Sequence, residues 1–109
     1  MKFKVTVEEA IRQLSTEQQF RFTAVMKHGS MTVEYYAPQS EDLQTWHRQD
    51  ELYVIISGSG IFYRDGERVD CKPGDTLFVP ARMEHRFENF SDDFAVWVIF
   101  YGPDGGENE

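Results

Sequence analysis

The sequence predicts an all-β domain that begins with one short helix, and three observations support this. Aromatic residues make up 15% of the chain, with nine Phe, five Tyr and two Trp, a composition that favours sheet. From Phe20 onward, apolar and polar residues alternate with the two-residue period of a strand. Turn signals at Gly58-Ser59-Gly60, Asp65-Gly66 and Pro73-Gly74-Asp75 divide the second half into short segments. Many short strands separated by regular turns are typical of a sandwich or a barrel.

The helix is expected between Val7 and Leu14. Thr6 and Glu9 stand three positions apart, as in a capping box, where the two side chains satisfy free backbone N–H groups at the start of a helix. The apolar residues that follow have helical spacing: Val7, Ala10, Ile11 and Leu14.

The first half of the chain is expected to continue as extended segments. A turn at His28-Gly29-Ser30 joins the first two segments, and a polar loop at Pro38 to Asp42 follows them. A second polar bend, at Arg48 to Asp50, separates the last two. The predicted extended segments are residues 20–27, 31–35, 43–47 and 51–56.

The second half is expected to supply the remaining strands. The turn signals separate three of them, at Ile61–Tyr63, Arg68–Cys71 and Thr76–Val79. The stretch Phe94 to Tyr101 is apolar without interruption, as expected of a strand covered on both faces, either by the N-terminal segment or by a second subunit. Gly102 to Glu109 is Gly-rich and acidic, which predicts a flexible tail.

Charge and cysteine content exclude several classes of partner and compartment. The formal net charge of −8 repels both a phosphate backbone and an anionic membrane surface, so neither nucleic acid nor membrane is expected as a partner. No apolar run approaches the length of a membrane span. The single Cys71 excludes an internal disulfide, and no signal peptide is expected before Thr6, which together predict a cytoplasmic protein.

Two of the three His residues stand in patterned surroundings. His47 and Glu51 lie four positions apart across the polar bend, and Gly58 closes this pattern. His85 is the centre of a second pattern, made with Gly74, Pro80 and Asn89. His28, by contrast, lies at a predicted turn outside both patterns and is expected at the surface.

At these two patterns the chain resembles the cupin family. Its first motif contains a Gly, two His separated by one residue, a Glu and a second Gly, and its second contains Gly, Pro, Gly, His and Asn at fixed intervals. The two motifs cover about residues 39 to 89, nearly half of the chain. Three positions depart from the family pattern: Gln39 replaces a Gly, Thr45 replaces the first His, and Arg82 replaces a Gly.

The resemblance implies a fold and a site. The fold is a double-stranded antiparallel β-barrel of the cupin, or jelly-roll, type with a short N-terminal helix. It forms one domain over residues 1–109, with an N-terminal segment at 1–19, the barrel at 20–101 and the tail at 102–109. The site is one divalent metal ion, Fe, Zn, Mn or Ni, held by His47, Glu51 and His85. The implied partners are a small-molecule ligand or substrate and a second copy of the chain in a homodimer.

Strand alternation adds pocket residues to this site. Thr45 shares a face with His47, Tyr53 shares a face with Glu51, and both Phe87 and Asn89 share a face with His85. We therefore expect Thr45, Tyr53, Phe87 and Asn89 to line the pocket. Because Thr45 replaces one family ligand, three ligands remain, and two imidazoles with one carboxylate still form the triad that binds ferrous iron in many oxygenases.

Three interpretations stay open at the level of sequence. The first is a metal-dependent oxygenase or isomerase that acts on a small organic substrate. The second is a non-catalytic module that binds or senses a metabolite. The third is a set of polar residues at a barrel mouth that holds no ion. The fold alone does not choose between them, because this barrel supports many unrelated chemistries.

Overall fold

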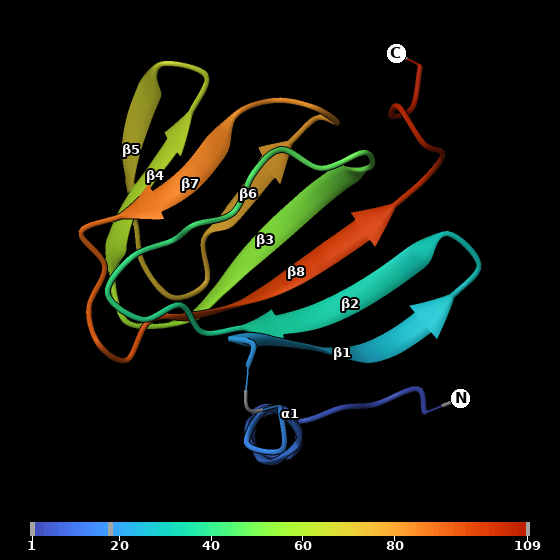
Figure 1. Ribbon diagram of the computed structural model, residues 1–109, viewed down its shortest axis with the longest axis vertical. Coiled ribbons are helices and arrows are strands. Elements are labelled where there is room, and N and C mark those ends of the chain that lie inside the picture. Colours follow the sequence, from blue (N-terminus) through green and yellow to red (C-terminus); the bar gives the residue numbers. More distant parts are fainter. Residues whose placement is uncertain (1, 18, 109) are drawn as a thin grey trace.

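Two antiparallel sheets face each other, and one helix packs on the outside of the larger sheet (Figure 1). The structure is a computed structural model that describes residues 2–17 and 19–108; Met1, Gln18 and Glu109, which belong to the predicted domain, lie outside the described residues. The larger sheet has the order β1-β2-β8-β3-β6 and the smaller one β5-β4-β7. This arrangement confirms the predicted all-β fold class, with one short helix among the described residues.

The elements follow the predicted order closely. They are α1 (Val7–Leu14), β1 (Phe22–His28), β2 (Met31–Tyr36), β3 (Asp50–Ser57), β4 (Gly60–Arg64), β5 (Glu67–Cys71), β6 (Thr76–Val79), β7 (His85–Glu88) and β8 (Ala95–Tyr101). Within the described part of the chain, no helix has the length and apolar character needed to cross a membrane.

The helix covers the outer face of the larger sheet. Thr6 and Glu9 form the expected capping box at its start, with both reciprocal hydrogen bonds 3.1 Å long. Ala10 and Leu14 then pack against Tyr35 of β2 and Ala95 of β8. The N-terminal segment thus covers part of the outer face of the apolar run at residues 94–101, one of the two alternatives that the sequence leaves open.

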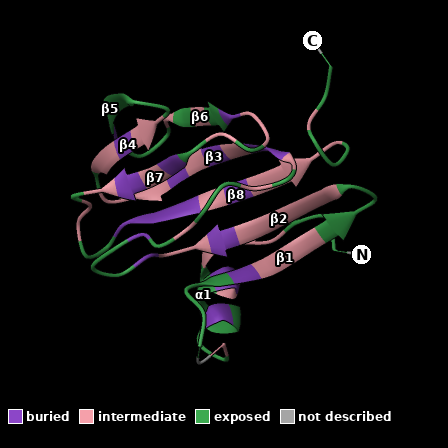
Figure 2. Cartoon of the chain, turned by 45° about the horizontal axis from the view of Figure 1, so that its top comes forward, coloured by how far each residue is buried: buried purple, intermediate pink, exposed green. Residues whose placement is uncertain are grey.

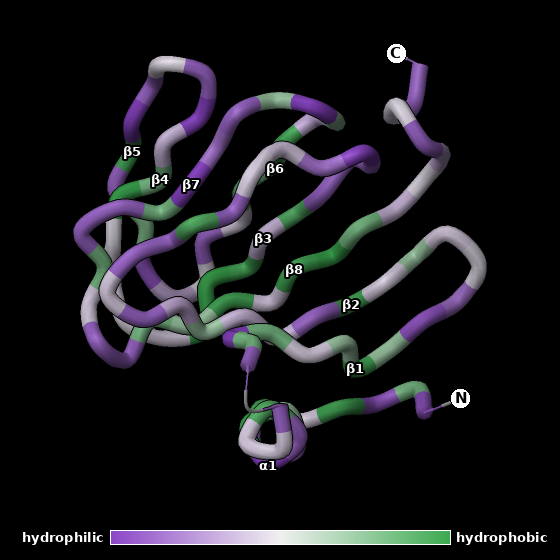
Figure 3. The backbone as a smooth tube through the Cα atoms, in the orientation of Figure 1, coloured by the Kyte–Doolittle hydropathy of each residue, from purple (hydrophilic) through white to green (hydrophobic). Residues whose placement is uncertain are grey.

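The other face of the same strand lines the barrel interior. Val96 and Val98 of β8 are buried there, together with Tyr53 of β3 and the rings of Phe62 and Phe87. Figure 2 shows that burial is concentrated in β3, β7 and β8, while β5 is largely exposed. Figure 3 shows the same preference in hydropathy, with apolar stretches along β3 and β8. The inner faces of the central strands β3 and β8 are therefore buried, while α1 covers only part of the outer face of the sheet.

The connection between β2 and β3 differs from the sequence prediction. Residues 43–47 are expected to be extended as a strand, but 42–47 have no regular structure. Their backbone groups pair with turns instead of with a neighbouring strand: the carbonyl of His47 accepts from the N–H of Arg82 at 2.7 Å, and the carbonyl of Arg48 accepts from the N–H of Gly105 at 2.6 Å. Without a ladder partner, alternation does not decide which side chains of this segment point inward.

The C-terminal residues also differ from the expected flexible tail. The buried carboxylate of Asp50 accepts hydrogen bonds from the N–H of Glu107 at 2.8 Å and from that of Ala81 at 2.9 Å. Gly102 donates its N–H to the hydroxyl of Ser30 at 3.1 Å. Tail residues thus bind the same end of the barrel as the β2–β3 connection, because unpaired backbone donors there find buried acceptors.

Gly58, which closes the first motif, occupies a position where no other residue fits. Its φ of +76° lies in the left-handed region, and a Cβ atom there would lie 2.8 Å from the Cα of Phe94 and would also collide with the hydroxyl of Ser91. Phe94 is fully buried at the start of the apolar run. The glycine therefore permits the close approach of the β3–β4 turn to the segment before β8.

Gly58→Ala is expected to destabilise the fold by about 2 to 5 kcal/mol, because it adds a steric clash to left-handed strain. The matched control is Gly66→Ala, whose φ is +89° but whose added Cβ meets no atom within 4 Å, so that only the strain of about 1 to 2 kcal/mol remains. Urea denaturation followed by fluorescence measures both losses. Equal losses in the two variants would contradict the close-approach argument.

Candidate metal centre

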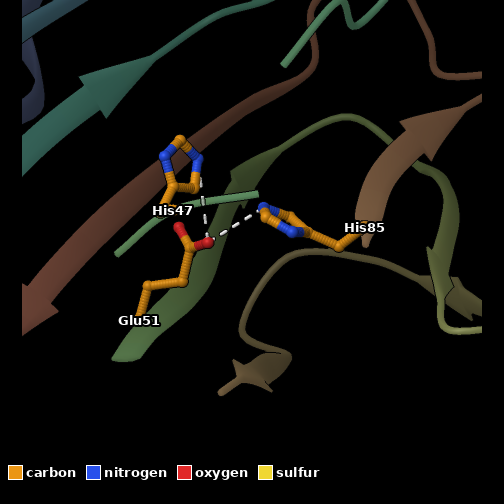
Figure 4. Close-up of side chains that lie close together, drawn as sticks. All are labelled: His47, Glu51 and His85. Carbon is orange, nitrogen blue, oxygen red and sulfur yellow. Dashed lines mark ion pairs between the residues drawn. The ribbon is translucent and has the colours of Figure 1, made fainter. Parts of the chain in front are cut away.

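The three predicted metal ligands come together from three separate elements (Figure 4). His47 lies in the β2–β3 connection, Glu51 is the second residue of β3, and His85 is the first residue of β7. One potential ligand atom from each lies within 4.8 Å of those of the other two. The barrel therefore brings residues from opposite sheets and a loop to one point.

The carboxylate of Glu51 lies between the two imidazoles. Its Oε1 is 2.9 Å from Nε2 of His85 and 3.8 Å from Nε2 of His47. Glu51 and His85 are 1% and 2% exposed, whereas His47 is half-buried. His47 thus forms the solvent side of the cluster, and the other two form its base.

The hydrogen bonds of His85 fix which of its ring nitrogens faces the cluster. Its Nδ1 lies 2.9 Å from the carbonyl of Met83. Because a carbonyl only accepts, Nδ1 carries a proton, and Nε2 is directed at Glu51 and at the hydroxyl of Tyr53, 3.1 Å away. A neutral His85 therefore presents the lone pair of Nε2 to the cluster, which is the orientation of a metal ligand.

The two imidazoles differ in their affinity for protons. Burial disfavours a charged His85, but the hydrogen bond to Glu51 and the charge of that carboxylate outweigh it and raise the pKa of His85 above its usual value. Burial lowers the pKa of His47 below its usual value. A proton on His85 and a bound cation would therefore compete for the position beside the carboxylate of Glu51.

A divalent transition metal fits the residues present. Among the residues that the structure describes, Oε2 of Glu51 is a buried side-chain oxygen without a hydrogen-bond partner. Such an atom is costly, because a carboxylate oxygen removed from water normally gains hydrogen bonds or a cation. Two imidazoles and a carboxylate are ligands that suit iron, zinc, manganese and nickel. The cluster therefore could hold one such ion.

Gln44 is a part of the site that the sequence patterns did not identify. Its Oε1 lies 3.2 Å from Nε2 of His47 and accepts a hydrogen bond from the hydroxyl of Tyr53 at 2.9 Å. Spacing gives no sign of this, because Gln44 matches no position of either motif and lies where the chain is not a strand. Only the path of the connection shows that its side chain turns inward.

The buried carboxylate of Asp42 orients this connection. Its two oxygens accept four hydrogen bonds: from the hydroxyl of Tyr36 at 2.5 Å, the backbone and side-chain N–H groups of Gln44 at 3.2 and 2.7 Å, and the N–H of Phe87 at 2.8 Å. Phe87 belongs to β7, so Asp42 joins the connection directly to the smaller sheet. Both oxygens of Asp42 are satisfied, in contrast to those of Glu51.

The expected pocket residues separate into two groups. Tyr53 is fully buried beside the cluster, where burial holds the pKa of its hydroxyl well above the usual value. Phe87 is also buried, but its ring packs beneath, 4.9 Å from the ring of Tyr53, and belongs to the core. Both positions follow from strand alternation, which holds in β3 and β7.

Thr45 and Asn89 lie away from the cluster. Thr45 is exposed, because the alternation that placed it beside His47 does not apply to an irregular connection. Asn89 follows the last residue of β7 with a φ of +48°, and it lines a different hollow with Cys71 and Asp75. The strand ends one residue too early for Asn89 to share the face of His85.

Arg82 stands at one of the positions where the family motif has a Gly. Its φ of +66° is in the left-handed region, which explains why a Gly is usual there. The side chain is exposed, while the N–H donates to the carbonyl of His47. The residue therefore acts on the site through its backbone, by fixing the chain at His47.

A hollow of about 620 Å³ opens beside His47 and Gln44. Its wall is largely apolar, and its charged members include Glu34 of β2, whose pKa is raised by burial and by the charge of Glu51. Sequence reasoning did not select Glu34, although alternation in β2 places it on the same face as Tyr36. The other main wall residues are Arg21, Phe22, Tyr36, Leu43, Val98 and Phe100.

Comparison with known proteins agrees with this arrangement. The family model described as "Cupin domain" matches residues 32–101. An uncharacterised protein of Streptomyces coelicolor is 32% identical, over 72% of this chain and 77% of that protein. An acireductone dioxygenase of Rhodopseudomonas palustris is 45% identical, over 46% of this chain, but the match spans only 36% of the dioxygenase.

Solved structures share the fold at lower sequence identity. A cupin 2 conserved barrel protein of Salinispora arenicola aligns with a TM-score of 0.66 and 16% identity, covering 94% of this chain and 89% of that one. The DMSP lyase DddQ of Ruegeria pomeroyi aligns with a TM-score of 0.65 and 19% identity, covering 93% of this chain and 56% of the lyase. At these identities the likeness concerns the barrel, not the chemistry.

Asp42→Asn is expected to lower the free energy of unfolding by about 1 to 3 kcal/mol, because the new NH₂ group would face hydrogen-bond donors that need an acceptor. Asp70→Asn, at an exposed position of β5, is the control and should change stability by less than about 0.5 kcal/mol. Urea denaturation of the metal-free proteins measures both. If the two variants lost equal stability, Asp42 would not anchor the connection.

Proposed function

The chain belongs to the cupin family, and from this we propose that it is a metal-dependent enzyme of the oxygenase type that acts on a small organic molecule. The observation that carries the proposal is the convergence of His47, Glu51 and His85 beside a largely apolar hollow, whose wall includes His47. The likeness to an acireductone dioxygenase supports the oxygenase class among the chemistries of this fold.

The bound ion would supply a Lewis acid with coordination positions open to a small ligand. Glu51 and His85 hold the base of the site rigidly, because Glu51 lies in a central strand and His85 is fixed by the carbonyl of Met83. His47 lies on the side of the hollow, where its ring also packs edge-on against Phe100 with centroids 5.0 Å apart. A ligand in the hollow would therefore approach the ion from the side of His47.

The wall of the hollow contributes two functions. Phe22, Leu43 and Phe100 give the hollow an apolar surface, against which a bound ligand would displace water next to the ion and so strengthen electrostatic interactions there. Glu34 lines the hollow and is suited to exchange a proton with a ligand, because burial raises its pKa and so makes the protonated carboxyl group easier to form. Tyr53 is less suited to this role, since its hydroxyl is buried and bonded to Gln44 and His85.

The homodimer and the cytoplasmic location remain predictions. A homodimer is expected from the family, although part of the apolar run that motivated it is covered by α1. The cytoplasm is expected from the single free cysteine, Cys71, which is buried.

His85→Ala and Glu51→Gln are each expected to weaken Zn²⁺ or Fe²⁺ binding more than about 100-fold, because each removes one of few ligands. His28→Ala, at an exposed position outside the site, should leave affinity unchanged. Calorimetric titration of the metal-free proteins gives the affinities. Wild-type protein that took up neither ion would refute the metal site.

Glu51→Gln also separates function from folding. In metal-free protein at a pH above the pKa of His85, where its Nε2 carries no proton, this change should leave stability equal or raise it, because a neutral amide replaces a buried charge and can donate to Nε2. A merely structural carboxylate would instead lose stability on the same change. Thermal unfolding in the presence of a chelator measures this.

Catalysis is tested with an oxygen electrode. Iron-loaded protein is expected to consume dioxygen with at least one member of a panel of small organic compounds that includes an acireductone, and Glu51→Gln should abolish the consumption. Compounds that raise the thermal midpoint of the loaded protein without any consumption would favour the binding or sensor module instead.

A further inference from the structure

We propose that Gln44 supplies the fourth protein ligand of the metal centre through its side-chain carbonyl oxygen, and that Asp42 positions it. The proposal rests on the metal-binding function proposed above. Gln44 would thus supply the ligand that is lost because Thr45 stands at the position of the family's first His.

The orientation of the Gln44 amide is fixed by its partner. Its Nε2 lies 2.7 Å from Oδ2 of Asp42, and a carboxylate accepts hydrogen bonds but does not donate them. The NH₂ end must therefore face Asp42, and Oε1 must face the cluster. The backbone N–H of Gln44 also donates to Asp42, at 3.2 Å, so that main chain and side chain are held by one carboxylate.

The oxygen so directed lies at the cluster. Oε1 of Gln44 is 3.2 Å from Nε2 of His47, and the hydroxyl of Tyr53 links it to Nε2 of His85 through contacts of 2.9 and 3.1 Å. Oε1 of Gln44 thus lies next to His47 at the edge of the group formed by His47, Glu51 and His85, and Tyr53 joins it to His85.

The spacing of these atoms suits a shared ion. Ligand atoms about 2.1 Å from one ion lie roughly 3.0 Å apart in an octahedron and roughly 3.4 Å apart in a tetrahedron. The distance from Gln44 to His47 is 3.2 Å, and those from Glu51 to His85 and His47 are 2.9 and 3.8 Å. The distance between Oε1 of Gln44 and Nε2 of His47 therefore falls within the range expected for two ligand atoms of one ion.

A different role for Gln44 makes the opposite prediction. If Oε1 only accepted a hydrogen bond from Nε2–H of His47, it would hold the ring with that nitrogen protonated and closed to metal. Removing Gln44 would then free the nitrogen and tighten metal binding. If Oε1 is a ligand, its removal weakens binding. The sign of the change distinguishes the two roles.

The experiment measures Zn²⁺ and Co²⁺ affinity by competition with a chromophoric chelator in wild type, Gln44→Ala, Gln44→His and Thr45→Ala. Gln44→Ala is expected to weaken binding about tenfold and to change the visible absorption of the Co²⁺ form, which reports the ligand number. Gln44→His, which restores an imidazole near the fourth position, should bind as tightly as wild type or more so. Thr45→Ala, at the exposed neighbour, should match wild type in both measurements.

Three outcomes decide the matter. If Gln44→Ala binds metal as tightly as wild type or more tightly, with a wild-type Co²⁺ spectrum, Gln44 is not a ligand. If His85→Ala still loses metal in that case, the proposed metal site survives. Weakening in Thr45→Ala equal to that in Gln44→Ala also overturns the ligand role. A wild type that binds neither ion overturns both proposals. Circular dichroism of each variant confirms that changes in affinity are not caused by unfolding.

Discussion

The buried carboxylate of Glu51 is the constraint on which the site depends. It is held in a central strand between β6 and β8, out of reach of water, with one oxygen unpartnered among the described residues. A negative charge in such a place requires a compensating positive charge. The hydrogen bond to Glu51 and its charge raise the pKa of His85 despite burial, and the side chains of His47 and Gln44 lie beside the same cluster. The site is thus organised around one buried negative charge.

Asp42 and Glu51 show how similar groups serve different purposes in one molecule. Both are buried carboxylates close to the β2–β3 connection. Asp42 is saturated by four donors and joins the connection to β7, which is a structural role. Glu51 lacks such donors and keeps its capacity to bind an ion. In this protein, the number of hydrogen bonds that each buried carboxylate accepts therefore distinguishes the structural role of Asp42 from the binding role proposed for Glu51.

Much of the fold and part of the site could be predicted from the sequence. Alternation and turn residues give the strands, and motif spacing gives His47, Glu51 and His85, because these patterns reflect local geometry. Gln44 could not be predicted, since its direction depends on a hydrogen bond between Asp42 and Phe87, 45 residues apart. Thr45 and Asn89 also lie outside the regular strands, so alternation does not give the directions of their side chains. Alternation holds only where a backbone ladder enforces it.

The left-handed turn at Arg82 has a mechanical consequence. The N–H of Arg82 holds the carbonyl of His47, and the same turn leads within three residues into His85. His47 and His85 are therefore joined through one surface turn, whereas Glu51 is held in the sheet by its strand neighbours. The spacing of the two imidazoles thus depends on the conformation of this turn and not on the register of the larger sheet.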